Sequence, residues 1–246
     1  MTATTRRLFL GIDSVSRQAA VSLADGDAVL VLRATGAAPA RGETLAGCIR
    51  DAFDEIGAGI AELAAIAVAT GPGSYTGARV GIALASGLAL PRKLPVFGVN
   101  SLELSVLCCP RVRGRVCAVL PTNGSGFYAA CYEALDGVPR ETLAPRLCSP
   151  EELGALLEES GSNWLLVGEG AQNALESWPS GASDRPLVTP AEIGAAAALA
   201  ITCAAKLESG PMVVTSHPKP LYLAGSGARP NRNRVVAHSL GGGADT

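Results

Sequence analysis

The stretch 65–89 constrains the fold of this chain more than any other. Residues 65–70, AIAVAT, form a small apolar run of strand length, and residues 71–77, GPGSYTG, hold three glycines and a proline that enforce a sharp turn. From Thr76 to Leu90 the pattern becomes helical. The stretch therefore predicts a strand, a tight glycine loop and a helix in succession, an arrangement typical of α/β proteins.

Small side chains recur at every fourth position of the predicted helix, at Gly77, Gly81 and Ala85. This spacing puts them on one face, where a second helix can approach closely. Such a face suits packing inside the chain or across a subunit boundary, and the sequence leaves both open. Arg79, one turn into the helix, is open to three interpretations: an anion clamp, an ion pair with a carboxylate on a neighbouring subunit, or a solvated side chain.

A glycine loop that leads into a helix can also present backbone N–H groups to a phosphate. The P-loop motif needs a lysine where Ala78 stands, and the dinucleotide fingerprint needs a glycine where Thr76 stands. A hydrolase elbow needs glycines where Pro72 and Thr76 stand. We therefore favour a packing role for the glycines and keep an anion or nucleotide loop as the alternative. Its residues would be Asp13, Ser14, Gly71, Gly73 and Ser74.

The composition indicates a globular chain with a substantial core. The chain has 246 residues, enough for one large domain or two lobes, and 48% of them are hydrophobic against 17% charged. Its net charge of −2 lacks the basic excess of a nucleic-acid-binding domain. Contact with RNA would therefore have to be shared with a more basic partner.

The seven cysteines form neither a metal-binding nor a disulfide pattern. Their number is odd, no Cys-x-x-Cys occurs, and His217 and His238 are the chain's two histidines. We interpret the cysteines as small buried residues in a reducing compartment, and we predict no metal site.

The N-terminal Arg6-Arg7 resembles the head of a twin-arginine export signal, but Asp13 and Arg17 interrupt the apolar region that export needs. The longest uncharged run near the C-terminus, Ile193–Ala205, is too short to span a bilayer. We therefore predict a cytoplasmic location without a membrane partner.

Strand and turn signals occur twice along the chain. Two predicted strands precede Asp25-Gly26 and two precede Asp136-Gly137, and each turn leads into a further strand and then a helix. The sequence therefore predicts an α/β protein with two similar β-β-β-α lobes. We place the first lobe at residues 1–112, a second, smaller lobe at 113–224, and a flexible tail at 225–246.

Five segments, in a fixed order, carry a family resemblance. They are LGID at 10–13, GPGSYTGARVG at 71–81, LPVFGV at 94–99, GEGA at 168–171 and PLYL at 220–223. Together they resemble the TsaB family, also called YeaZ, from Leu8 to Leu223, and the segment 71–81 is the specific part. The resemblance implies the two-lobed fold of the actin, sugar-kinase and Hsp70 superfamily, in agreement with the predicted repeat.

The resemblance implies a non-catalytic role in forming threonylcarbamoyladenosine, at the adenosine next to the anticodon in tRNAs that read ANN codons. TsaB-like proteins are relatives of TsaD, the subunit that binds metal and transfers the threonylcarbamoyl group, and they pair with it through first-lobe helices. The small ATPase TsaE joins the assembly, and tRNA is met only through the complex. Similar proteins also form homodimers through the same surface. The resemblance implies no tightly bound cofactor and leaves open an ATP or ADP at a subunit interface of the complex.

By this resemblance, the partner-binding helices are residues 43–56 and 76–90. The expected interface consists of Leu45, Ile49, Thr76, Gly77, Arg79, Val80, Gly81, Leu84 and Ala85. A leucine at Gly81 should then abolish pairing and leave the monomer folded.

The chain departs from the family pattern in its second lobe, where Pro121-Thr122-Asn123 and Gly126-Phe127-Tyr128 replace Asp-Ala-Arg and Glu-Val-Tyr. The alternative function is a nucleotide-binding ATPase or kinase of the same fold, using Asp13 and the segment Gly168-Glu169-Gly170. Such enzymes need carboxylates from both lobes around Mg²⁺, and the loop 121–125 has none. We reject a zinc hydrolase, because two histidines so far apart in the sequence give no ligand motif.

Overall fold

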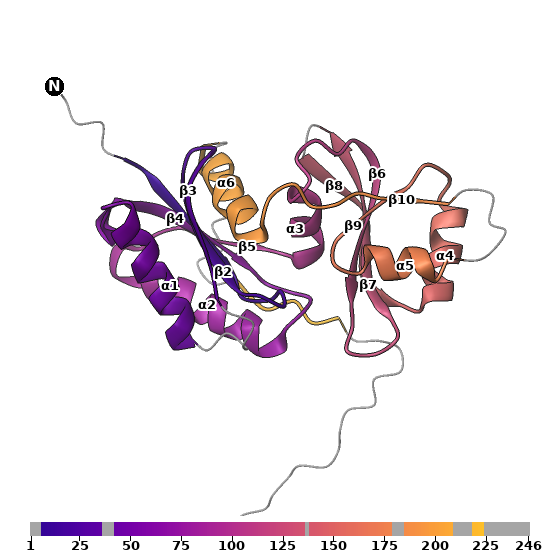
Figure 1. Ribbon diagram of the computed structural model, residues 1–246, viewed down its shortest axis with the longest axis horizontal. Helices are drawn as coiled ribbons and strands as arrows, with labels where there is room; N and C mark the ends of the chain where they lie inside the picture. The colour runs from indigo at the N-terminus through magenta and orange to yellow at the C-terminus, as the bar shows by residue number, and fades with distance from the viewer. Residues whose placement is uncertain (1–5, 36–41, 136–137, 179–184, 209–217, 224–246) are drawn as a thin grey trace, which may run out of the picture.

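The computed structural model describes residues 6–35, 42–135, 138–178, 185–208 and 218–223 (Figure 1). The predicted tail, 225–246, lies outside them. The described chain consists of two halves with the same order of elements. The first half contains β1 (Leu8–Asp13), β2 (Ala20–Asp25), β3 (Ala28–Ala34), α1 (Gly42–Glu55), β4 (Leu63–Ala69), α2 (Tyr75–Ala89), β5 (Val96–Val99) and α3 (Ser101–Leu107), with 3-10 turns at Ile60–Glu62 and Leu90–Arg92. The second half contains β6 (Gly114–Pro121), β7 (Phe127–Leu135), β8 (Val138–Cys148), α4 (Pro150–Glu159), β9 (Leu165–Val167), α5 (Ala171–Glu176), β10 (Leu187–Val188) and α6 (Ala195–Glu208).

Each half is built on a five-stranded mixed sheet, and the two sheets share one strand order. Sheet A has the order β3-β2-β1-β4-β5, and sheet B has the equivalent order β8-β7-β6-β9-β10. In both, the first three strands are antiparallel neighbours, and the fourth lies parallel to the first. The predicted duplication is therefore confirmed, and with it the two-lobed fold class of actin, sugar kinases and Hsp70.

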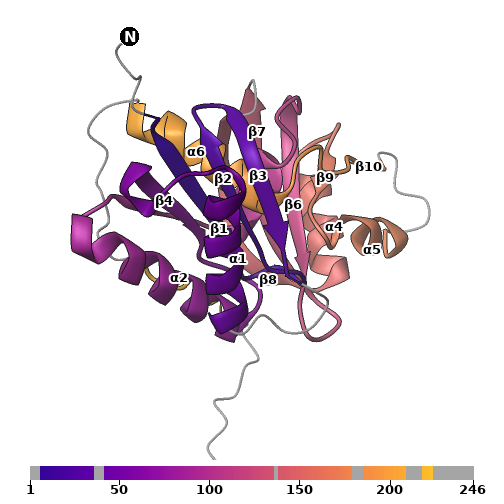
Figure 2. The ribbon, with the colours of Figure 1, turned by 60° about the vertical axis from the view of Figure 1, so that its left-hand side comes forward.

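Helices cover both faces of sheet A. The helices α1 and α2 pack on one face, and α6 packs on the other (Figures 1 and 2). Strand β1 is consequently buried on both sides, because Leu10 and Ile12 belong to the core under α1 and α2 while Phe9 belongs to the core under α6. A strand covered on both faces has no solvent side, which explains why β4, and β1 up to Asp13, are apolar rather than alternating.

The two halves exchange their last helices. α6, from the end of the chain, packs on β1, β2 and β4, whereas α3, from the first half, packs on β6 and β7 of sheet B. Both helices lie between the two sheets and contact each other (Figure 1). The division of the chain at residues 112 and 113 stays a prediction, but the contacts show that each half contributes one helix to the sheet of the other half. Apolar periodicity shows that a helix has a buried face, but it does not show which sheet covers that face.

Gly11 allows α6 to lie directly against β1. A β-carbon at residue 11 would overlap the carbonyl oxygen of Ala196 and would lie 2.7 Å from the backbone nitrogen of Ala200. The helix is rich in buried alanine on this side, so its backbone approaches the strand closely. The contact joins the start of the chain to its last described helix.

Side-chain caps fix the starts of α3 and α4. The side chain of Asn100 accepts a hydrogen bond of 2.7 Å from the Glu103 backbone N–H at the start of α3. Ser149 and Glu152 form a reciprocal capping box at the start of α4. Within the described ranges, every helix is too short or too polar to cross a membrane.

Candidate functional site

The glycine loop between β4 and α2 adopts a conformation that suits glycine. Gly71 has a φ of +101° and Gly73 a φ of +145°, values that residues with a β-carbon rarely adopt. A β-carbon at residue 71 would lie 3.0 Å from the carbonyl oxygen of Leu221, and one at residue 73 would lie 2.5 Å from a methyl group of Val15. The loop therefore packs between the β1–β2 connection and the C-terminal segment 218–223.

The start of α2 is fixed to the end of β1 by a close contact between Ser14 and Gly77. The Ser14 hydroxyl donates a hydrogen bond of 2.7 Å to the Gly77 carbonyl oxygen. The Ser14 carbonyl oxygen occupies the space that a β-carbon at residue 77 would need. The N–H of Gly77 donates a hydrogen bond of 3.1 Å to the hydroxyl oxygen of Ser74. Ser74 is thereby the N-cap of α2.

The five residues of the predicted anion loop come together in space, but four backbone amides around them have protein acceptors. The N–H groups of Val15 and Ser16 donate to a carboxylate oxygen of Asp13, at 3.0 and 3.3 Å. The N–H of Ser74 donates to the Val15 carbonyl oxygen, and the N–H of Gly77 donates to Ser74. An anion at this loop would have to displace these bonds, so the geometry favours the packing role of the glycines.

Asp13 is 2% exposed, and burial raises the pKa of its carboxyl, against the opposing effect of hydrogen bonds from Ser16 and Val15. Glu169, from the turn after β9, lies near it: burial and the charge of Asp13 raise the pKa of Glu169, and Arg17 lowers it. Each half thus contributes one carboxyl here. Among the described residues, no three His, Cys, Asp or Glu side chains form a group that could hold a metal ion.

The small-residue stripe faces the interior of the chain. Gly77, Gly81 and Ala85 are buried, and a β-carbon at residue 81 would overlap the Ser14 hydroxyl oxygen and lie 3.3 Å from a Val68 methyl group. Of the two alternatives, packing inside the chain is therefore the correct one. A leucine at Gly81 should disrupt the monomer, contrary to our expectation.

Two further residues of the expected interface, Leu45 and Ile49 on α1, are also buried in the core of sheet A. Both side chains pack between α1 and sheet A, so a partner protein cannot contact them. Thr76, Arg79, Val80 and Leu84 remain exposed or partly exposed. The predicted helices are thus the outer layer of sheet A, but five of the nine predicted interface side chains point inward.

A different row of α2 faces away from the sheet. It consists of Thr76, Val80, Ala83 and Gly87, and Leu90 in the 3-10 turn after the helix continues it; all but the half-buried Val80 are exposed. The intervals of four and three residues place them along one outward stripe, as in the seam of a packed helix pair. Gly87 has open space around it, and Leu90 is 75% exposed. Since α1 lies beside α2 on the same face of the sheet, the two helices form one outward surface (Figure 2), which we call the α1–α2 face.

The sequence reasoning missed two tyrosines next to this face. Tyr75 begins α2, and Tyr222 belongs to the C-terminal segment, yet their ring centroids lie 5.0 Å apart. The guanidinium carbon of Arg79 lies 3.8 Å from the centroid of the Tyr75 ring and 5.6 Å from that of Tyr222. The PLYL segment was noted only for its resemblance, because no local pattern shows that it returns to α2.

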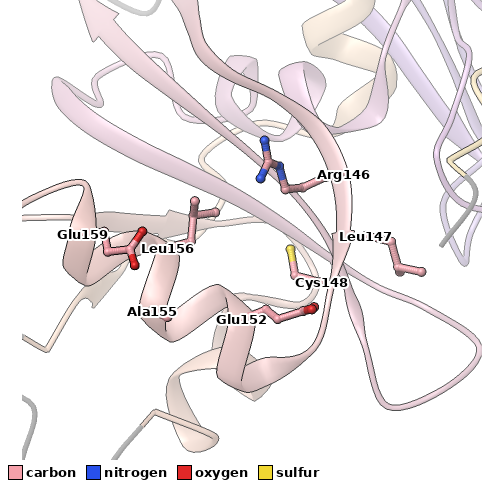
Figure 3. A pocket seen from close by; sticks show the side chains of 7 residues that line it. All are labelled: Arg146, Leu147, Cys148, Glu152, Ala155, Leu156 and Glu159. Carbon is pink, nitrogen blue, oxygen red and sulfur yellow. The ribbon is translucent and has the colours of Figure 1, made fainter. Parts of the chain in front are cut away.

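A hollow of about 320 Å³ lies on the second half, between β8 and α4 (Figure 3). Its lining consists of Arg146, Leu147, Cys148, Glu152, Ala155, Leu156 and Glu159. None of these is a predicted site residue, and the carboxylates and the arginine are those of an ordinary polar surface. We assign no function to it.

The repeated lobes and the outward α1–α2 face define a class of protein, the two-lobed actin-like fold with two helices on the outer face of its first sheet. Comparison with known proteins makes this specific. A sequence model described as TsaD, tRNA N6-adenosine threonylcarbamoyltransferase, matches residues 35–171. The tRNA threonylcarbamoyladenosine biosynthesis protein TsaB of Escherichia coli is 30% identical over 201 residues, 79% of this chain and 81% of that protein. The chain belongs to the TsaB family.

Other relatives agree with this placement. The threonylcarbamoyltransferase of a Ruegeria species is 44% identical, but over only 118 residues, 43% of this chain and 32% of that enzyme. The solved structure of YeaZ from Pseudomonas aeruginosa superposes with a TM-score of 0.70 at 23% identity, covering 88% of this chain and 100% of that one. The structural similarity supports the fold, and the E. coli relative supports the family.

Proposed function

We propose that this chain is a non-catalytic subunit that pairs with the threonylcarbamoyltransferase TsaD. Through this pairing it takes part in threonylcarbamoylation of the adenosine next to the anticodon in tRNAs that read ANN codons. The observation that carries the proposal is the outward stripe of α2, from Thr76 to Leu90. It is uncharged, has small side chains at its centre, and is continuous with α1. Such a surface allows a second pair of helices to approach closely.

The match of residues 35–171 to the TsaD family model is a second reason to propose this pairing. Two related chains that share this fold can pair through equivalent helical faces, in the manner of a two-fold dimer. The same reasoning makes a homodimer the competing state of the free chain. In this proposal the partner supplies the catalytic groups, TsaE joins the assembly, and the complex works in the cytoplasm.

The hydrogen-bonded amides of the glycine loop and of the β1–β2 connection beside it support a structural rather than a catalytic role for the loop. Because Val15, Ser16, Ser74 and Gly77 direct their N–H groups to protein acceptors, we assign no phosphate transfer to this site. Any ATP or ADP would sit at a subunit interface of the complex. With a net charge of −2, the chain would meet tRNA only through its partners.

The test is to mix the purified chain with TsaD from the same organism and to measure the mass of the product by size-exclusion chromatography with light scattering. A one-to-one complex is expected. A second measurement, calorimetric titration with Mg-ATP, addresses the alternative ATPase or kinase, which would require heat of binding by the chain alone.

A further inference from the structure

The C-terminal segment 218–223 returns to the start of α2 and is held there by its backbone. The N–H of Leu221 donates a hydrogen bond of 2.8 Å to the carbonyl oxygen of Thr70, the last residue before the glycine loop. Pro218 lies over Gly98, where a β-carbon would be 2.9 Å from the proline ring. These contacts place Tyr222 against Tyr75, with the two rings tilted by 34°.

The two rings position Arg79. Its guanidinium carbon lies over Tyr75 at 3.8 Å and near Tyr222 at 5.6 Å, both within the range of cation–π attraction. Stacking restricts the side chain but covers only the face of the guanidinium group, so an acceptor can still reach the N–H donors at its edge. Tyr75 and Tyr222 are themselves 55% and 50% exposed, so the cluster lies at the surface.

No carboxylate neutralises Arg79 within the part of the chain that the structure describes. The ion pairs found there involve other arginines, such as Arg33 with Glu55 and Arg111 with Glu192. The first turn of α2 contains no acidic residue. An oriented arginine without an anionic neighbour is a ready site for a carboxylate from another molecule.

Arg79 flanks the outward stripe of α2, since it lies three residues after Thr76 and four before Ala83. The stripe itself carries no charge. If a partner helix packs on this stripe, the side chains at the edge of that helix therefore lie close to Arg79. Aromatic residues and arginine next to a small-residue seam are also the types that most often dominate binding energy at interfaces.

We propose that Arg79, held by Tyr75 and Tyr222, receives a carboxylate side chain of the threonylcarbamoyltransferase subunit, and that the C-terminal segment is thereby part of the partner-binding surface. This inference rests on the proposed pairing. The ligand of Arg79 is a protein carboxylate rather than an RNA phosphate, because the adjoining stripe is uncharged and fits a helix. The net charge of −2 also disfavours RNA as the ligand.

The test measures the dissociation constant between this chain and TsaD by titration calorimetry. Arg79→Gln should weaken binding by ~30-fold or more and should reduce its dependence on salt, as expected for the loss of a close charge pair. The matched control is Arg115→Gln, since Arg115 also stacks on an aromatic ring, Trp164 at 5.1 Å, but on the second half of the molecule. The control should bind within about twofold of the wild type.

Variants of Tyr222 test the positioning role. Tyr222→Leu should weaken binding several-fold, because Arg79 loses one of its two rings, whereas Tyr222→Phe keeps the ring and should restore wild-type affinity. Circular dichroism and melting temperatures verify that each variant is folded.

Three results would overturn the inference, and they are distinguishable. If the wild-type chain does not bind TsaD, the proposed function fails and the inference fails with it. If the wild type binds but Arg79→Gln behaves like Arg115→Gln, the pairing stands and the role of Arg79 is wrong. If Arg79→Gln pairs normally but the assembled complex loses affinity for tRNA, the ligand of Arg79 is a phosphate and the carboxylate assignment is wrong.

Discussion

The hydroxyl of Ser14 donates a hydrogen bond of 2.7 Å to the carbonyl oxygen of Gly77, and the Ser14 carbonyl oxygen fills the space beside the Gly77 α-carbon. The end of β1 and the start of α2 are thus joined directly. This contact links the glycine loop to the orientation of α2, and through α2 to the outward face that we propose for pairing.

Gly77→Ala should destabilise the monomer, because its methyl group would overlap the Ser14 carbonyl oxygen and the backbone would have to move. We expect the free energy of unfolding, measured with urea, to fall by about 2 kcal/mol or more. The matched control is Gly87→Ala, also in α2, which has open space around it and should gain about 0.5–1 kcal/mol from helix propensity. Equal stabilities for the two variants would contradict the packing role of Gly77.

Gly11→Ala should loosen the docking of α6 on sheet A, since the added methyl group would meet the backbone at Ala196 and Ala200. We expect a loss of about 1–3 kcal/mol in unfolding free energy. Hydrogen exchange should also accelerate in α6 more than in α4. Uniform acceleration in both helices would indicate global destabilisation rather than loss of this contact.

Asp13→Asn should stabilise the protein at neutral pH. Burial raises the pKa of Asp13 above its ordinary value of 3.8, so the folded protein holds the proton more tightly than the unfolded chain does. The free energy of unfolding therefore falls as the pH rises from about 3.8 through the raised pKa, and the cost of the carboxylate is fully present above it. Asparagine retains an acceptor oxygen for Val15 and Ser16 without the charge.

Urea titrations between about pH 3 and pH 7 would measure this effect. The variant should be more stable than the wild type at pH 7, and the difference should vanish at the acidic end. Asp25→Asn, at an exposed position, is the control. A variant less stable than the wild type at pH 7 would mean that the Asp13 charge itself is required by the fold.

Six of the seven cysteines should resist alkylation in the native protein. Cys48 is partly exposed, whereas the other six are buried, and burial raises the pKa of Cys108 to about 12 and that of Cys148 to about 11. At Cys108 and Cys148 the reactive thiolate is therefore scarce as well as shielded, whereas burial is what shields Cys131, whose pKa the hydrogen bond with Cys117 lowers. Mass spectrometry after iodoacetamide treatment should find one rapid modification, at Cys48, and seven only in urea; rapid labelling of Cys108 would contradict the burial.

The duplicated lobes could be predicted because their signals are local. The Asp25-Gly26 turn, the Asn100 cap and the apolar runs of β1 and β4 depend on neighbouring residues alone. The exchange of α3 and α6 could not be predicted in this way. It depends on which sheet covers each helix, and the requirement of Gly11 for a close helix appears only when α6 is in place.

The candidate site likewise has a part that the sequence predicts and a part that it does not. The glycine segment correctly predicts the helix α2, and its small residues form a buried packing stripe. The spacing of small residues does not show, however, which side of the helix is buried. Helix α2 carries two rows of small residues, a buried row through Gly81 and an exposed row through Gly87. Tyr222 contributes to the surface only through long-range packing of the C-terminal segment on Thr70.

The most direct test of the account uses Gly87→Leu, which adds a large side chain to the outward stripe where the monomer has room for it. Its control is Gln172→Leu, which adds the same side chain at an exposed position of α5. Light scattering after size-exclusion chromatography with TsaD should show a one-to-one complex for the wild type and for Gln172→Leu, and two separate proteins for Gly87→Leu. A stable complex with Gly87→Leu would contradict the assignment of the α1–α2 face as the partner-binding surface.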